Sequence, residues 1–269
     1  MTAKHTSLKF INLHNGDGVC AVLTLARPDQ ANAFSAIMMD EIIQHCADLK
    51  TKSDLRALII TGEGKHFSAG ADLDWMKSSA QLTFEENVRD AARLTGMFEA
   101  LIAVNAPKIA AIKGAVYGGA VGLVACCDFA VADTNAKFCL SEAKLGLLPA
   151  VISPYLARKM NPGQLRRAAL TARVMKAAEA KEYGLVEVVT DDLKASLLAE
   201  INAILGCAPH AQMAINKLFD HLRANSLRQC DETLQAIAAA RTGSEGQAGL
   251  KSFFDKTSQP WIRTVAEIL

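Results

Sequence analysis

Two small-residue turns, each following an apolar run, expose backbone amides where the chain could bind a ligand oxygen. The first covers residues 67–76, F-S-A-G-A-D-L-D-W-M, and follows an apolar run at 55–61. The second follows residues 108–113 and contains Gly118 and Gly119 at the start of an apolar stretch. Glycine lets a backbone approach a ligand closely, and the first N–H groups of a helix have no intrahelical acceptor. Two such donors on one oxygen would form an oxyanion hole.

One carboxylate has the setting that an acid/base group needs. Glu142 lies between Ser141 and Ala143 in a largely apolar run at 136–149. Partial burial disfavours the charged form of a carboxyl and raises its pKa toward neutral pH. Glu142 is therefore a candidate general acid or base, although most Glu residues in loops are simply solvated.

Three strings of the sequence resemble the crotonase, or enoyl-CoA hydratase/isomerase, superfamily. They are F-S-A-G-A-D, K-G-A-V-Y-G-G-A-V-G-L-V-A-C-C-D, and F-C-L-S-E-A-K-L-G-L-L-P-A-V-I-S-P-Y at 138–155. The similarity begins near residues 26–34, A-R-P-D-Q-A-N-A-F, and ends with F-F-D-K and Trp261. Within the superfamily, G-A-D-L-D-W-M and S-E-A-K-L-G-L-L-P-A-V-I-S-P-Y are most similar to methylglutaconyl-CoA hydratases and carboxygeranoyl-CoA-type hydratases.

The resemblance implies a role for each of these motifs. The backbone N–H groups of Ala71 and Gly119 would bind the thioester carbonyl oxygen of an acyl-CoA, and Glu142 would be the catalytic acid/base. Coenzyme A enters as part of the substrate, so neither a separate cofactor nor a metal is expected. The implied substrate- and CoA-binding residues are Arg27, Ala31, Asn32, Ala33, Ser68, Ala69, Gly70, Asp72, Leu73, Trp75, Met76, Tyr117, Gly118, Val151 and Lys256. Of these, Lys256 matches a position from which a neighbouring subunit approaches the nucleotide phosphate.

One position departs from the family pattern. Two-carboxylate enoyl-CoA hydratases carry a second Glu three residues after the oxyanion glycine, and this chain has Gly122 there. Three alternatives remain open: Glu142 alone manages both water and proton, a group from elsewhere substitutes, or the reaction is an isomerisation that needs one base. Asp72 and Asp74 are candidate helpers, although acidic residues near a helix N-terminus ordinarily serve the helix dipole.

We expect a lyase that adds or removes water across the C2=C3 bond of an enoyl-CoA thioester, branched or carboxylated like 3-methylglutaconyl-CoA. The alternatives are a Δ3,Δ2 double-bond isomerase with a single Glu and a non-catalytic acyl-CoA-binding protein of the same fold. A carboxylated substrate requires a cation or several donors, for which Lys144 and Ser153 are the candidates.

The elements that must position these residues alternate between strand and helix. Apolar runs predict strands at 19–25, 55–61, 109–112, 129–132 and 185–189, with helices between them at 84–103, 120–127, 164–170 and 176–183, which indicates an α/β class. Ser35 is expected to cap an earlier helix, and S-E-G-Q at 244–247 has the order of a capping box. This alternation alone favours a doubly wound sheet. The resemblance implies instead a crotonase-like spiral of ββα repeats over residues 1–200, followed by a helical oligomerisation segment at 201–269. It also implies a homotrimer or a dimer of trimers.

Composition limits the other possibilities. A formal net charge of +1 provides no basic surface for nucleic acid, and the seven cysteines form no C-x-x-C pair. The apolar stretch at 114–127 is shorter than the roughly 20 residues that a membrane span needs. We expect a soluble protein of the cytoplasm or an organelle matrix. A dinucleotide fingerprint fails because Tyr117 stands where its first glycine is required, and no G-x-S-x-G is present.

Overall fold

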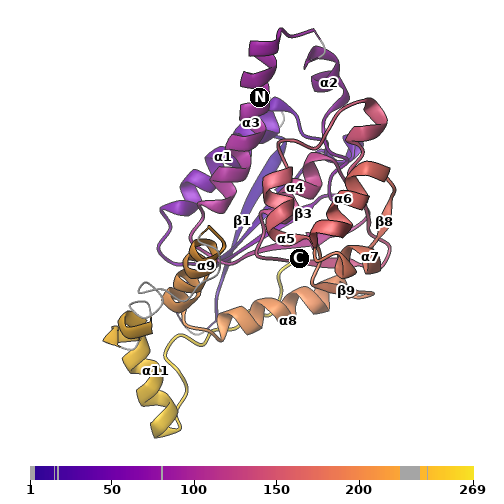
Figure 1. Ribbon diagram of the computed structural model, residues 1–269. Coiled ribbons are helices and arrows are strands. Elements are labelled where there is room, and N and C mark those ends of the chain that lie inside the picture. Colours follow the sequence, from indigo (N-terminus) through magenta and orange to yellow (C-terminus); the bar gives the residue numbers. More distant parts are fainter. Residues whose placement is uncertain (1–3, 15, 17, 80, 225–236, 241) are drawn as a thin grey trace.

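The computed structural model describes residues 4–14, 16, 18–79, 81–224, 237–240 and 242–269 (Figure 1). Its larger sheet has the strand order β1-β2-β3-β4-β6-β9, and β5, β7 and β8 form a smaller sheet. The strands of the larger sheet are β1 (Thr6–Asn12), β2 (Val19–Leu25), β3 (Leu55–Gly62), β4 (Lys108–Ile112), β6 (Phe129–Asp133) and β9 (Val188–Thr190). Those of the smaller sheet are β5 (Ala115–Tyr117), β7 (Lys137–Cys139) and β8 (Met175–Lys176).

The strands of the larger sheet follow one another in chain order from one edge to the other. From β2 to β9 all pairs are parallel, whereas β1 is antiparallel to β2. A doubly wound sheet would reverse its strand order, so the expectation from alternation alone is wrong. Instead β4 and β6 each give way to a strand of the smaller sheet, β5 and β7. The expected spiral of ββα units is confirmed.

The central strands are buried on both faces, as parallel strands covered by helices usually are. All residues of β3 and β4 are buried. On one face, Leu58 and Ile60 join a core that also contains residues of α1, α3, α4 and α5. On the other face, Ala57 and Ile59 pack with α8 and the C-terminal residues.

The helices begin and end close to the limits that the sequence predicts. Ser35 caps the first long helix as expected, because its hydroxyl accepts from the Met38 N–H at 3.2 Å. The helical segments are η1 (Pro28–Gln30), α1 (Ala36–Lys50), α2 (Leu73–Ser79), α3 (Phe84–Ile102), α4 (Gly119–Ala125), η2 (Glu142–Leu145), α5 (Ser153–Lys159), α6 (Pro162–Thr171), α7 (Ala177–Glu182), α8 (Leu193–Leu205), α9 (Pro209–Ala224) and α11 (Ser244–Asp255). Within the described ranges, no helix combines the length and apolar character that crossing a bilayer requires.

The division of the chain expected after residue 200 remains a prediction. Residue 200 itself lies inside α8, whose Leu197 and Ile201 pack against the larger sheet. A capping box that begins at Ser244 is wrong, because α11 starts at Ser244 with Gly243 as its N-cap. The carboxylate of Glu245 instead accepts from the first N–H groups of α9. In Figure 1, α9 and α11 extend away from α2.

Helix α4 packs so closely on its neighbours that its middle residue has no room for a side chain. A Cβ built on Gly122 would lie 2.4 Å from Cγ2 of Ile152 and 3.0 Å from Cζ of Phe98. Both neighbours are buried, one directly before α5 and the other on α3. The position at which the family pattern expects a second Glu is therefore filled by two apolar side chains.

This packing predicts that Gly122→Ala destabilises the fold. The added methyl overpacks the core, and we expect the free energy of unfolding to fall by about 1–3 kcal/mol, measured by denaturant titration. The matched control is Gly96→Ala on α3, where the new Cβ would meet only Ile43, at 3.8 Å. That change should raise stability by roughly 0.5–1 kcal/mol because alanine is the better helix former. Equal stability of the two variants would contradict the packing described.

Candidate active site

Backbone pairing directs the N–H of Ala71, the first donor of the candidate oxyanion hole, away from the strand that it pairs with. Phe34 donates its N–H to Gly70 O at 2.7 Å and accepts from the Asp72 N–H at 3.0 Å. Because both bonds go to the residues on either side of Ala71, the N–H of Ala71 itself points away from Phe34. No acceptor among the described residues bonds to it. On its other edge the segment pairs with β5, where Ser68 lies opposite Val116.

The second amide opens helix α4. Gly118 has φ +52°, a conformation that favours glycine, and its own N–H donates to Cys139 O at 2.9 Å. The N–H of Gly119, the first residue of the helix, has no acceptor in the described chain. A Cβ built on Gly70 would lie 2.5 Å from Tyr117 O and 3.7 Å from Gly118 Cα. The two turns are therefore in contact, and the amides that follow them lie close together.

Glu142 lies against the same turn. It is the first residue of η2, which follows β7, and β7 pairs with β5 in the smaller sheet. A Cβ built on Gly118 would lie 3.5 Å from Oε1 of Glu142. The smaller sheet therefore brings together three sites that are far apart in the sequence: Ala71, Gly119 and Glu142.

The environment of Glu142 favours its protonated form. Its side chain is half-buried, and its Oε2 is buried without a hydrogen-bond partner in the described chain. Burial raises the pKa of this carboxyl above its ordinary value, against a smaller opposing effect of its own backbone N–H. A carboxyl with a raised pKa can take up and release a proton near neutral pH.

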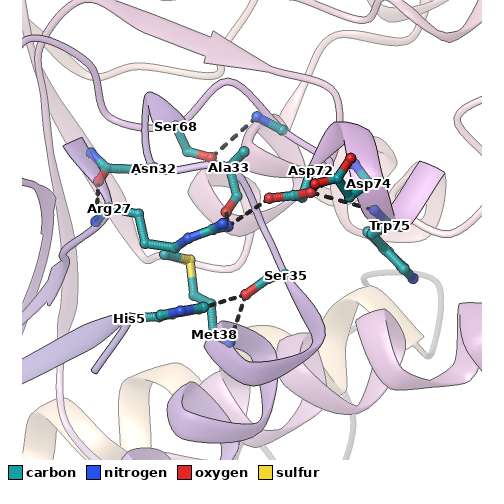
Figure 2. A network of polar contacts seen from close by, with 11 residues as sticks. His5, Arg27, Asn32, Ala33, Ser35, Met38, Ser68, Asp72, Asp74 and Trp75 are labelled. Atoms are coloured by element: carbon teal, nitrogen blue, oxygen red, sulfur yellow. Dashed lines mark hydrogen bonds and ion pairs between the residues drawn. The ribbon is translucent and has the colours of Figure 1, made fainter. Parts of the chain in front are cut away.

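A second group of predicted residues forms a bonded network beside the first turn (Figure 2). Nη1 of Arg27 pairs with Oδ2 of Asp72 at 2.8 Å and donates to Ala33 O at 2.7 Å. Oδ1 of Asp72 accepts from the N–H groups of Asp74 at 2.8 Å and Trp75 at 3.4 Å, so it also caps α2. Burial acts to raise the pKa of Asp72, but these hydrogen bonds and the Arg27 charge hold it below its ordinary value. The opposite charges of Arg27 and Asp72 therefore compensate each other within the protein.

Asn32 and Ser68 shape the network from inside it. Both are fully buried. Asn32 accepts from the Arg27 N–H at 2.9 Å and donates to the carbonyls of Glu63 and His66 at 2.9 and 2.8 Å. Ser68 Oγ accepts from a backbone N–H two residues later, at 3.2 Å. Their side chains hold the loops, which leaves backbone as the part of 31–33 and 68–71 available to a substrate.

The remaining predicted residues differ in their surroundings. Leu73 is exposed, whereas Trp75, Met76, Tyr117 and Val151 are half-buried. Lys256 is exposed and is the C-cap of α11, a helix that lies apart from α2 and α4 (Figure 1).

Two site features were missed in the sequence reasoning. Nε1 of Trp75 donates to Oδ1 of Asp90 at 2.9 Å, which ties α2 to α3. Asp90 precedes Leu94 and Phe98 at helical spacing, and these two side chains lie near Gly119 and Gly122. The i, i+4, i+8 pattern was the available signal. The other feature is Ile152, whose contact with Gly122 no local pattern indicates.

The arrangement can stabilise negative charge on an oxygen and move a proton beside it. Two amide donors without acceptors among the described residues lie near a half-buried carboxyl. No cluster of three or more His, Cys, Asp or Glu side chains able to hold a metal ion occurs among the described residues.

Known proteins share both the sequence pattern and the fold. The family model described as enoyl-CoA hydratase/isomerase matches residues 15–264. A Thermus thermophilus protein that carries the provisional name of an enoyl-CoA hydratase is 32% identical over 243 residues, covering 89% of this chain and 96% of its own.

Solved structures agree with this assignment. An enoyl-CoA hydratase from Shewanella pealeana has a TM-score of 0.87 and 39% identity over 94% of this chain and 95% of its own. Pseudomonas aeruginosa AtuE has a TM-score of 0.85 and 31% identity over 94% and 98%. With the family model matching nearly the whole chain, these comparisons show that the protein belongs to the enoyl-CoA hydratase/isomerase family.

Proposed function

We propose that this protein is an enoyl-CoA hydratase, which adds water across the C2=C3 bond of an enoyl-CoA thioester or removes it. The observation that carries the proposal is the position of Glu142, a desolvated carboxyl beside the turn that ends in the free Gly119 amide. Relatives that bear the name enoyl-CoA hydratase support it. Coenzyme A enters as part of the substrate, and no separate cofactor is proposed.

The proposed chemistry uses each of these groups once. Water bonds to C3, and its proton passes to the Glu142 carboxylate. The electron pair of the C2=C3 bond moves toward the thioester, so negative charge develops on the carbonyl oxygen. The amides of Ala71 and Gly119 stabilise that oxygen, and each such donor can contribute roughly 3–4 kcal/mol in the transition state. Glu142 then returns its proton to C2.

For the substrate, we propose a branched or carboxylated enoyl group similar to 3-methylglutaconyl. Its acyl part would lie against Trp75, Met76, Tyr117 and Val151. Lys144 is the candidate cation that would bind a carboxylate of the substrate. It lies two residues after Glu142 on η2, is exposed, and has no ion-pair partner among the described residues. Ser153 is less suited, since its hydroxyl already donates to Pro149 O at 2.6 Å.

A double-bond isomerase is the second candidate, and the packing at Gly122 favours it. With Ile152 and Phe98 filling the place of a second carboxylate, one Glu is what an isomerase that shuttles a single proton requires. A non-catalytic acyl-CoA-binding protein is the third candidate. Glu142 argues against it, because its desolvated carboxyl, whose Oε2 has no hydrogen-bond partner in the described chain, serves no purpose in binding alone.

We also propose a homotrimer or a dimer of trimers in the cytoplasm or an organelle matrix. The exposed apolar side chains of Phe253 and Phe254 on α11, 70% and 74% exposed, support association through this helix. In such an assembly Lys256 would reach the nucleotide of a neighbouring subunit. The described cysteines are free thiols, five of them buried, which supports a reducing compartment.

Replacing Glu142 tests the function and separates the three candidates. Loss of enoyl-thioester absorbance is followed with 3-methylglutaconyl-CoA and crotonyl-CoA, and gain of conjugation with a 3-enoyl-CoA. We expect wild-type hydration, and a fall of about 10²–10⁴-fold in kcat for Glu142→Gln. Conjugation of the 3-enoyl substrate without any hydration would instead identify an isomerase. Inactivity toward all three substrates, with acyl-CoA binding retained, would identify a binding protein.

The raised pKa of Glu142 predicts an unusual acid limb. The ionised carboxylate is the base, so kcat/KM for hydration should fall as pH decreases through a pKa above the roughly 4.3 of an ordinary Glu. A limb at the ordinary value would contradict the desolvation described.

The raised pKa of Glu142 also predicts how the stability of the fold depends on pH: the ionisation that activity requires destabilises the folded protein. A raised carboxyl pKa stabilises the fold fully below the unfolded-state pKa, and this contribution is lost as pH rises through the folded-state value. At pH 7 the ionised group is therefore unfavourable. Glu142→Gln should have a higher Tm than wild type at pH 7, and the difference should shrink toward pH 4, as measured by thermal denaturation.

The proposed role of Lys144 predicts selective loss of affinity. For Lys144→Gln we expect the KM for 3-methylglutaconyl-CoA to rise about three- to tenfold, the loss of one exposed charge-assisted contact, with crotonyl-CoA unaffected. The control is Lys137→Gln, an exposed lysine on β7. Equal effects on both substrates would count against a substrate carboxylate at Lys144.

A further inference from the structure

A small space bounded by two oxygens lies beside Gly118. The position that a Cβ would occupy there is 3.5 Å from Oε1 of Glu142 and 3.9 Å from Oγ of Ser141. Apart from the residues adjacent to Gly118, no other heavy atom of the described chain comes within 4 Å of it. Both oxygens therefore face the side of Gly118 that lacks a side chain, where a water farther from Cα than a Cβ could lie between them.

The hydroxyl of Ser141 makes no hydrogen bond within the described part of the chain. Ser141 is the N-cap of η2, but its side chain makes no capping bond. It is half-buried, and its Oγ has no hydrogen-bond partner among the described residues. Other serines of the loops around the site do have partners: Ser35, Ser68 and Ser153. The two oxygens facing the space are thus a hydroxyl without a partner and a carboxyl whose other oxygen is also unpaired.

The usual place for a second water-holding group is closed. Ile152 and Phe98 occupy the volume above Gly122, so a group that assists Glu142 must come from elsewhere. Ser141 precedes Glu142 in the chain and faces the same space. We therefore propose that the Ser141 hydroxyl, with Glu142, holds the water that is added to the substrate; this inference rests on the proposed hydratase function.

The step balances without any further reactant. The water donates one hydrogen to the Glu142 carboxylate and the other to Ser141 Oγ, which leaves a lone pair free to attack C3. As the C3–O bond forms, the π pair of C2=C3 moves into the thioester enolate, and the first proton passes to Glu142. The enolate then takes that proton at C2. Ser141 keeps its own proton throughout.

Two reactions on the same protein distinguish holding water from supporting the site. Hydration of the enoyl-CoA that the wild type uses requires water, base and oxyanion hole. Exchange of the C2 hydrogen of butyryl-CoA for deuterium in D₂O, followed by mass spectrometry, requires only the base and the oxyanion hole.

For Ser141→Ala we expect the hydration kcat to fall by about tenfold, the loss of one hydrogen bond, with KM and the exchange rate within about twofold of wild type. Ser141→Thr retains the hydroxyl and should hydrate within about threefold of wild type. The exposed Ser53→Ala is the matched control.

Three results would overturn the proposal. If Ser141→Ala hydrates as fast as wild type, the hydroxyl holds no water. If hydration and exchange fall together, Ser141 supports the structure of the site only. If the wild type exchanges the C2 hydrogen but hydrates no enoyl-CoA, the hydratase function fails first and the role of Ser141 fails with it.

Discussion

The site depends on the backbone pairing of residues 67–72, which are hydrogen-bonded on both edges. Phe34 bonds to the residues on either side of Ala71, and β5 pairs with the opposite edge. This double pairing leaves the Ala71 N–H without an acceptor among the described residues and packs the segment against the turn before Gly119. The proposed oxyanion hole needs no side chain, so the buried side chains of Asn32 and Arg27 can hold the loops instead.

Glu142 shows the free-energy cost of removing a carboxyl from water. Removing it from water raises its pKa and leaves one oxygen unpaired, which is unfavourable for the ionised group at neutral pH. The same desolvation suits the proton transfer that we propose for this group. The fold accommodates this cost by packing the carboxyl next to a glycine, where no side chain competes for the space.

Helix α4 contributes two different properties through two glycines. Gly119 offers an N–H at the start of the helix, and Gly122 lets α3 and α5 approach so closely that a second carboxylate cannot be accommodated. Under the proposed hydratase function, the packing at this one core position therefore decides which groups can reach the reacting water.

The local sequence pattern was enough to predict the strands, the Ser35 cap and the candidate catalytic residues, because burial and capping follow short-range periodicity. Glu142 and the two glycine-rich turns were found in the same way, and resemblance to a family replaced the doubly wound sheet with a spiral. Pattern could not predict that Arg27 pairs with Asp72, that Trp75 bonds to Asp90, or that Ile152 fills the space at Gly122. These contacts join segments between 15 and 45 residues apart along the chain. Only the packing of helices against two sheets decides which side chains meet, since atoms within 4 Å interact whatever their separation in sequence.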